Sequence, residues 1–245
     1  MKINKKILIA AVACIIAGAA ITAAATAALY SESLKSVNTV TKTISPDILN
    51  IKLTTDAGKI KIAASDTDEI TLTYSEDDTT RYTVTEDNHT LSVMPEKISK
   101  PKAEWYDYYF SINFHSNDIV LNVPPDFSAK TELSTDFGNI DVSGLNGSLS
   151  AECDYGEIKI TGGDFSKLDL KSDCGNIKFT GISGINMNME CSLGDISGTI
   201  SGDASDYSIW AASDAGKCNL TPSADGPMQL SAQTNLGNID IHFEQ

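Results

Sequence analysis

The chain has 245 residues, and its 33 acidic side chains outnumber 18 lysines and arginines, which leaves a formal net charge of −15. Phosphate backbones repel such a surface, so the composition excludes nucleic acid as a partner. The same charge opposes binding to anionic lipid head groups through a basic surface. It could attract divalent cations or basic partners, although an acidic surface most often serves solubility.

Residues 1–30 are predicted to be a membrane anchor. The basic start MKINKK precedes 24 uncharged residues, from Ile7 to Tyr30. As a helix they would span about 36 Å, against a hydrocarbon core of about 30 Å. This length favours an uncleaved signal anchor, and an Ala-x-Ala site at residues 23–25 leaves a cleaved signal peptide as the alternative. The lysines before the helix predict a single-pass cell-membrane protein whose C-terminal domain is extracytoplasmic, or secreted if the signal is cleaved.

Residues 31–43 are predicted to form a short polar stalk, and residues 44–127 a less regular N-terminal β region. Runs such as residues 48–53 and 69–74 predict strands, and the sequence EDNHTL predicts a hairpin turn. A D-x-G step at residues 56–58 is followed by alternating isoleucines. We therefore expect one early coil that carries a long insertion.

An aromatic insertion interrupts this β region. Its members are Trp105, Tyr106, Tyr108, Tyr109, Phe110 and Phe114. One interpretation is an exposed patch that contacts a partner protein, a glycan or the membrane interface. The other, which we favour, is a cap whose rings pack over the first coil and close the open end of the array.

A sequence step recurs through residues 128–245. It consists of an acidic or small polar residue, any residue and a glycine, with an apolar residue two places later. Its copies read STDFGNIDV, ECDYGEIKI, KSDCGNIKF, ECSLGDISG, ASDAGKCNL and QTNLGNIDI, and their glycines are 18, 19, 19, 22 and 21 residues apart. A fixed period near 20 residues predicts a solenoid.

The positions around each glycine predict how one coil is built. Apolar residues stand seven and five places before it, as in Leu168 and Leu170, and two and four places after it, as in Ile177 and Phe179. This change of parity predicts two strands that meet at a corner, where glycine can adopt a positive φ. The acid two places earlier is interpreted as turn chemistry, its side chain bonding backbone amides as in an Asx-turn. The predicted corner positions are Asp56, Gly58, Asp136, Gly138, Asp154, Gly156, Asp173, Gly175, Gly194, Asp214, Gly216, Asn235 and Gly237.

Such a coil lacks a core until its neighbours cover it, so the coils must stack, at about 4.8 Å each. The sequence therefore predicts an all-β fold. It is a single-stranded β-helix, or β-solenoid, of roughly six coils over residues 128–245. The less regular N-terminal β region and one transmembrane helix precede it.

The order of these features resembles the bacterial putative-adhesin family of β-strand repeat domains, of the type called domain of unknown function 4097. The resemblance rests on the early D-x-G-x-I step, on the segments HTLSV and IVLNVPPDF, and on the repeated T-D-x-G-x-I coils, and it covers residues 37–245. It implies a β-helical fold and a place in the cell envelope. It implies no catalytic residues.

The sequence offers little catalytic or metal-binding chemistry. Its three histidines belong to no GxSxG or HExxH motif, so we expect them to be solvated. Cys153 and Cys191 share a column two coils apart, about 9.6 Å, beyond the roughly 7 Å limit of a disulfide. We expect no cofactor and no metal, since no CxxC pair occurs and the nonapeptide of calcium-binding β-rolls is absent.

The sequence therefore predicts a non-enzymatic, membrane-tethered interaction module of the bacterial cell envelope, acting as an adhesin or as an accessory of envelope-stress regulation. Its predicted contacts are the membrane, through the N-terminal helix, and a protein or envelope polymer outside. Two alternatives stay open. They are a polysaccharide-acting β-helix enzyme that uses the turn aspartates, and a calcium-binding surface repeat protein.

Overall fold

The computed structural model describes residues 38–76, 80–96 and 118–244. The predicted membrane anchor and the aromatic insertion lie outside these residues. Within them, no helix is long and apolar enough to cross a membrane. Residues 38–43, which the sequence assigned to the stalk, form most of strand β1 (Asn38–Ile44).

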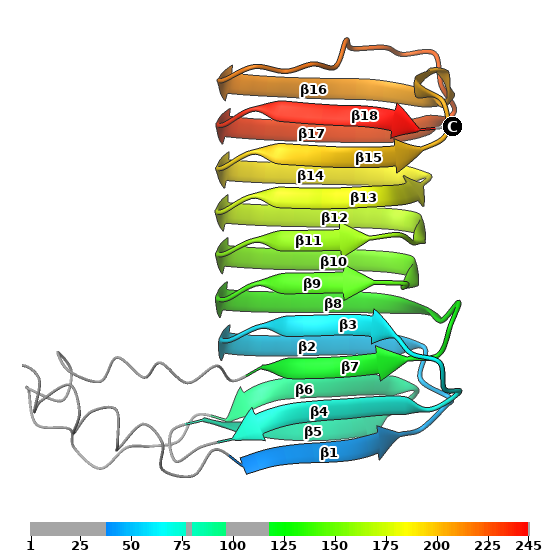
Figure 1. Cartoon of the computed structure of the whole chain (residues 1–245), viewed down its shortest axis with the longest axis vertical. Coiled ribbons are helices and arrows are strands. Elements are labelled where there is room, and N and C mark those ends of the chain that lie inside the picture. Colours follow the sequence, from blue (N-terminus) through cyan, green and yellow to red (C-terminus); the bar gives the residue numbers. More distant parts are fainter. Residues whose placement is uncertain (1–37, 77–79, 97–117, 245) are drawn as a thin grey trace, which may run out of the picture. The chain divides into compact units, whose positions relative to one another are not determined.

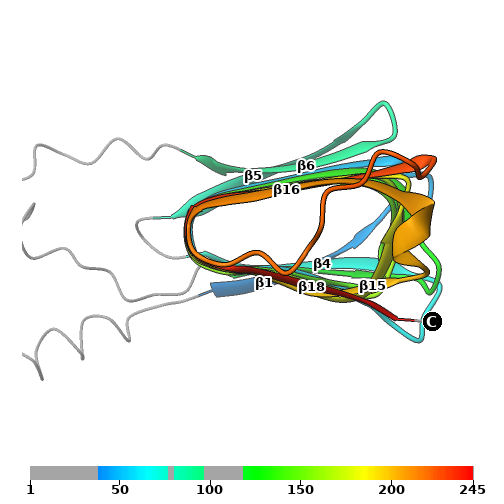
Figure 2. The same ribbon diagram turned by 90° about the horizontal axis from the view of Figure 1, so that it is seen from above.

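The described residues form two sheets that face each other along a stack of coils (Figures 1 and 2). Sheet 1 has the order β5 (Arg81–Asp87), β6 (Thr90–Glu96), β2 (Asn50–Ala57), β8 (Ser128–Phe137), β10 (Asn146–Tyr155), β12 (Asp164–Cys174), β14 (Asn186–Leu193), β17 (Met228–Leu236) and β16 (Tyr207–Ala215). Sheet 2 has the order β1, β4 (Ile70–Glu76), β7 (Ile119–Val123), β3 (Ile60–Ala64), β9 (Ile140–Ser143), β11 (Ile158–Thr161), β13 (Ile177–Gly184), β15 (Ile196–Ser201) and β18 (Ile239–Glu244). Neighbours within both sheets are parallel except β5–β6, β1–β4 and β4–β7.

Each regular coil is one strand of sheet 1, a glycine corner and one strand of sheet 2. In the coil of β10 and β11, Leu149 and Ala151 before the corner and Ile158 and Ile160 after it are all buried. The same columns are buried in the neighbouring coils and form one continuous core between the sheets. The solenoid predicted from the alternation is confirmed, because side chains of alternate residues turn inward on each strand.

The glycine at the corner is required by the close approach of the next coil. A Cβ atom on Gly156 would lie 1.9 Å from the carbonyl oxygen of Gly138, and the φ angle of Gly156 is +148°. The Gly156 N–H donates to the carbonyl of Cys174 in the following coil, at 3.0 Å. Any side chain here would break this contact and strain the backbone.

The stacking order departs from the expected succession at one place. The sequence suggested that the coil of Gly216 follows that of Gly194. Instead β17 pairs with β14 on one side and β16 on the other, so the coil of Gly237 lies between them. Without residues 203–226, the step from Gly194 to Gly237 would be 19 residues, as it is from Gly156 to Gly175.

Residues 203–226 are therefore an excursion that leaves one regular coil and closes the end of the stack. They contain the short 3₁₀ helix η1 (Ala204–Asp206) and β16. A second excursion, residues 66–126, carries β4 to β7 and closes the other end together with β1. Without it the step from Gly58 to Gly138 would again be 19 residues. Six regular coils thus stack in chain order: β2/β3, β8/β9, β10/β11, β12/β13, β14/β15 and β17/β18.

Candidate interaction surface

The glycine corners align along one edge of the stack, and each position around the glycine forms a column. Three places before the glycine, the column contains only small hydroxyl and thiol side chains. In spatial order they are Thr55, Thr135, Cys153, Ser172, Cys191, Thr234 and Ser213. From Thr135 onward each donates to the glycine carbonyl of the coil beneath it, at distances from 2.7 to 3.5 Å. This hydroxyl column satisfies a carbonyl that would otherwise be an unpaired corner acceptor.

The two cysteines of this column act as donors and not as reactive thiols. Burial raises the pKa of Cys153 to about 11, with the Asp154 carboxylate as the second cause. Burial likewise raises the pKa of the Cys191 thiol. Both stay protonated at neutral pH and donate to Gly138 and Gly175. The four cysteines in the described residues are free, so Cys153 and Cys191 do not pair with each other.

The acidic column two places before the glycine does not show the contacts of an Asx-turn. The carboxylates of Asp56, Asp136, Asp154, Asp173 and Asp214 make no hydrogen bond to any residue that the structure describes. Burial, together with the neighbouring charges of Asp56 and Asp154, raises the pKa of Asp136 above its ordinary value. The column is thus a row of stacked like charges on one side of the edge.

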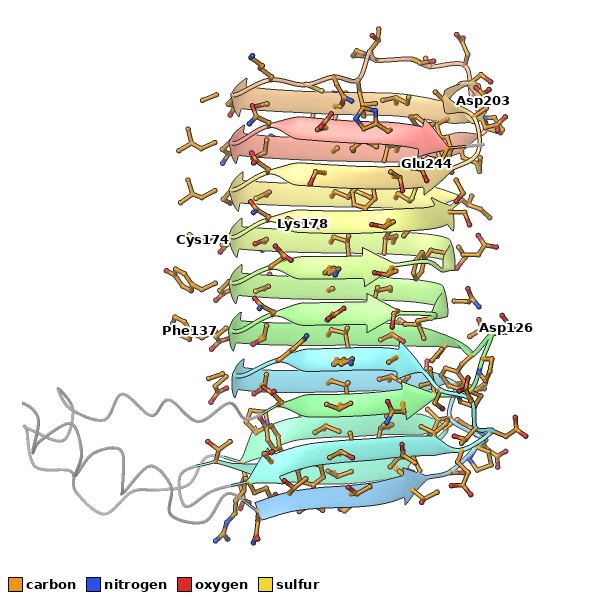
Figure 3. The ribbon with its side chains drawn as sticks, viewed as in Figure 1. Asp126, Phe137, Cys174, Lys178, Asp203 and Glu244 are labelled. Carbon is orange, nitrogen blue, oxygen red and sulfur yellow. The ribbon has the colours of Figure 1, made fainter. Side chains whose placement is uncertain are left out.

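The column directly before the glycine is an apolar ladder on the outside of the molecule. In spatial order it consists of Ala57, Phe137, Tyr155, Cys174, Leu193, Leu236 and Ala215. The Phe137 side chain is 59% exposed, Tyr155 56%, Leu193 47% and Leu236 55%. The Phe137 and Tyr155 rings stack, with centroids 5.0 Å apart. Figure 3 shows Phe137 and Cys174 pointing away from the same edge of the sheets.

The column after the glycine is polar and stitches the coils together. Side-chain oxygens of Asn139, Asn176, Asp195 and Asn238 each accept a backbone N–H from the adjacent coil, at 2.6 to 3.0 Å. The apolar ladder is therefore flanked by the acidic column on one side and by this amide column on the other.

A shallow hollow of about 200 Å³ lies on the outer face of sheet 1. Its carboxylates are Glu152, Asp169 and Glu190. Glu152 pairs with Lys171 at 2.7 Å, Asp169 pairs with Lys167, and Glu190 accepts from the Asn188 side chain. Each acid is already engaged, and the hollow is smaller than the roughly 300 Å³ at which ligand pockets usually begin.

The structure brings the predicted corner residues together on one edge, whereas the six aromatic residues from Trp105 to Phe114 lie outside the described residues. The His89 side chain, in a hairpin, donates from Nδ1 to the Asp47 carbonyl, and His242 lies beside Asp240 in β18. In the described part of the chain no three His, Cys, Asp or Glu side chains converge as metal ligands would.

Sequence reasoning missed the hydroxyl column and the apolar ladder, although both are visible in the repeat. Position −3 reads T, T, C, S, C, T and S over the seven corners, and position −1 reads A, F, Y, C, L, L and A in the same spatial order. The first pattern has a single chemistry. The second is a recurrent apolar position, which the structure places on the surface, and a row of exposed apolar side chains is typical of an interaction site.

Comparison with known proteins confirms the family that the sequence resembles. The family Toastrack DUF4097 matches twice, over residues 48–152 and 131–245. The comparison with curated proteins gives no match.

Solved structures resemble the chain at low identity. A putative cell adhesion protein from Clostridium sporogenes is 12% identical, covers 85% of this chain and 100% of its own, and has a TM-score of 0.43. A putative adhesin from Parabacteroides distasonis is 12% identical over 86% of this chain and 98% of its own, with a TM-score of 0.44. A putative adhesin from Bacteroides fragilis is 15% identical over 86% and 98%, with a TM-score of 0.39. Because the family match extends over residues 48–245, the chain belongs to the Toastrack DUF4097 family.

Proposed function

We propose that this protein is a non-enzymatic interaction module of the bacterial cell envelope, which contacts a protein or an envelope polymer through its glycine-corner edge. The apolar ladder is the observation that carries the proposal. Four large apolar side chains are about half exposed in consecutive or nearly consecutive coils. A contiguous apolar row rimmed by polar columns is typical of an interaction site.

The surface chemistry supports binding over catalysis. The carboxylates of the sheet 1 hollow are held by lysines and an amide, and the acidic column is a row along one edge of the stack. An enzyme that hydrolyses polysaccharides canonically uses two carboxylates placed on either side of a bound glycosidic bond. A straight row along one edge does not supply that arrangement.

The location is part of the proposal. Residues 7–30 are uncharged and follow a basic start, so we place the solenoid outside a membrane that this segment anchors. Adhesion and an accessory role in envelope-stress regulation both need such a tethered contact surface. Either role uses the ladder.

Site-specific photocrosslinking in cells tests the proposal. A photoreactive residue in place of Tyr155 in the full chain should form adducts with an envelope component. The same residue in place of Ile185, which is 58% exposed but lies outside the ladder, is the matched control and should form few. Protease added to intact cells should digest the solenoid. Equal adducts at both positions, or a protected solenoid, would contradict the proposal.

A further inference from the structure

We infer that the partner of the apolar ladder is a second copy of this chain, packed edge to edge with its coils level with those of the first. This inference rests on the proposed function, because it names a partner for the same ladder. It is carried by two features of the edge: the spacing of its rows and the charges that flank it.

The spacing of the ladder favours another solenoid. Its seven rows rise by about 4.8 Å each, so the ladder is about 29 Å long. A helix presents one side chain per turn of about 5.4 Å and would be out of step by about 3.6 Å over this length. A strand repeats every 6.6 to 6.8 Å on one face, roughly, and drifts much further. A second copy has the same rise and stays in register along every row.

The flanking charges select a parallel arrangement. A two-fold axis along the stack places the acidic column of one copy against the column after the glycine of the other, row by row. That column consists of asparagines and charged residues, among them Lys59, Glu157 and Lys217. At the two ends, Asp56 then faces Lys59, which also pairs with Asp141 of its own chain at 2.9 Å, and Asp214 faces Lys217 of the second copy. In the rows of Phe137 and Cys174 an aspartate faces an asparagine, which can donate from its amide.

One row opposes this arrangement. Asp154 faces Glu157 of the second copy, although Glu157 is already paired with Lys178 at 2.7 Å. The antiparallel arrangement is electrostatically less favourable. It would place Asp56 against Asp214, Asp173 against its own counterpart and Lys59 against Lys217, with no opposite charges facing.

The contact area sets the strength of the association. The two sheets of a coil lie about 10 Å apart, so the edge offers about 290 Å² per copy. Stable interfaces bury about 800 Å² per partner. The association is therefore weak in dilute solution and depends on a high local concentration, as copies anchored in one membrane would have.

Crosslinking through Cys174 tests the contact, because this residue is the fourth of the seven rows. Facing apolar side chains hold the backbones about 10 Å apart, beyond the roughly 7 Å limit for a disulfide, so a short bismaleimide is used in place of oxidation. The protein is the full chain in mild detergent, with Cys14→Ala and Cys218→Ala. We expect a covalent dimer.

The dimer yield should fall about tenfold with Phe137→Ser and Leu193→Ser together, the loss expected from removing interface anchors. Ile185→Ser, an equally exposed apolar site off the ladder, should leave the yield unchanged. Lys217→Glu should lower the yield, and Lys217→Glu combined with Asp214→Lys should restore it.

A second pair of variants reads the orientation. In a Cys174→Ser background, Ala57→Cys should crosslink to its own counterpart. A mixture of Ala57→Cys and Ala215→Cys should give no mixed dimer, because these residues lie at opposite ends of the ladder. The reverse result would overturn the parallel arrangement.

The inference falls if no covalent dimer forms at any protein concentration. It also falls if Cys174 resists a monofunctional maleimide, since another part of the chain would then cover the ladder. If the dimer is missing but photoadducts at position 155 persist in cells, the proposed function stands and the partner is a different molecule. If both are missing, both proposals fail.

Discussion

The six regular coils and the two excursions contain the same kind of strand but follow different rules. In the regular coils, the core columns stay apolar and neighbouring strands are parallel. The excursions, residues 66–126 and 203–226, interrupt the period of about 19 residues and include antiparallel pairs or a 3₁₀ turn. The repeated columns allow the coils to stack, whereas the inserted segments cover the two ends of the stack.

The largest expected effect is a difference in hydrogen-exchange protection between two deletions of similar size at the β16 end of the stack. Removing residues 203–226, with Pro227→Ala to keep a backbone donor in the join, restores a 19-residue step and should leave every regular coil folded. Removing residues 228–245 takes out a coil that lies beneath β16, so residues 204–226 should lose their protection as well. Hydrogen exchange followed by mass spectrometry measures both.

The deletion of residues 203–226 uncovers the edges of β17 and β18, so we also expect that variant to self-associate. Persistent protection of residues 207–215 after the other deletion would mean that β16 can pack directly on β14. The distinction between coil and excursion would then be wrong.

The next largest effect is expected from substitution of a corner glycine, which should cost more in a regular coil than in an excursion. Gly156→Ala in the middle of the stack combines a collision with the Gly138 carbonyl and a strained φ, and should cost about 3 to 5 kcal/mol. Gly216→Ala in the outer excursion meets the Gly237 carbonyl at 1.9 Å, but β16 pairs along its length with β17 alone, with one bridge from Ile209 to Ser223 on its other side, and can shift. It should cost about 1 to 2 kcal/mol. Urea denaturation gives both values, and equal losses would contradict the comparison.

The regular coils and the first excursion were predictable from sequence, since an early coil with a long insertion was expected, and the second excursion was not. Leu149, Ile158 and Ile177 alternate with polar residues, and burial of alternate residues is a local consequence of strand geometry. The place of Gly216 depends on which coils pair, and their rows are chemically equivalent. The regular spacing of the glycines predicted a coil at Gly216 but not its place in the stack. The 43-residue gap between Gly194 and Gly237 was the sequence feature that indicated an inserted segment.

Substitution of two threonines by valine should give smaller changes in stability, with opposite signs. Thr234→Val in a regular coil removes a 2.9 Å hydrogen bond to the Gly194 carbonyl and should destabilise the protein by about 1 kcal/mol. Thr131→Val should stabilise it by about 1 kcal/mol, since the buried Thr131 hydroxyl has no partner among the described residues. Melting temperatures of the two variants should therefore move in opposite directions. A melting temperature that rises with Thr234→Val would show that the hydroxyl column does not stabilise the corners.

The smallest effect concerns charge. The raised pKa of Asp136 means that the folded protein binds its proton more tightly than the unfolded chain does. Its contribution to stability is therefore greatest below the ordinary aspartate range and is lost as pH rises through the raised pKa. Asp136→Asn should stabilise the protein by less than about 1 kcal/mol at pH 7 and by nothing at pH 3, since the site is solvated.

Asp214 is the control for this charge effect, because its neighbour in the column is Asn235. Asp214→Asn should change the urea midpoint little at either pH. A gain at Asp214 equal to that at Asp136 would mean that stacking of like charges is not the cause.

The candidate surface was only half visible in the sequence. The corner residues were found because glycine and aspartate recur, but recurrence gave the aspartates a hydrogen-bonding role that their side chains do not show. The ladder from Phe137 to Leu236 escaped notice, since apolar residues one place before a glycine look like core until the corner turns them outward. Which way a corner residue points depends on the coil beneath it.

The position of the excursions on links between regular coils has a consequence for how this chain can evolve. Duplication of a unit of 18 or 19 residues between Gly138 and Gly194 adds one coil and leaves both closing segments intact. Each duplication lengthens the edge by about 4.8 Å and adds one row. The length of the interaction edge and the avidity of binding can thus change by duplication alone, while the closing segments stay the same.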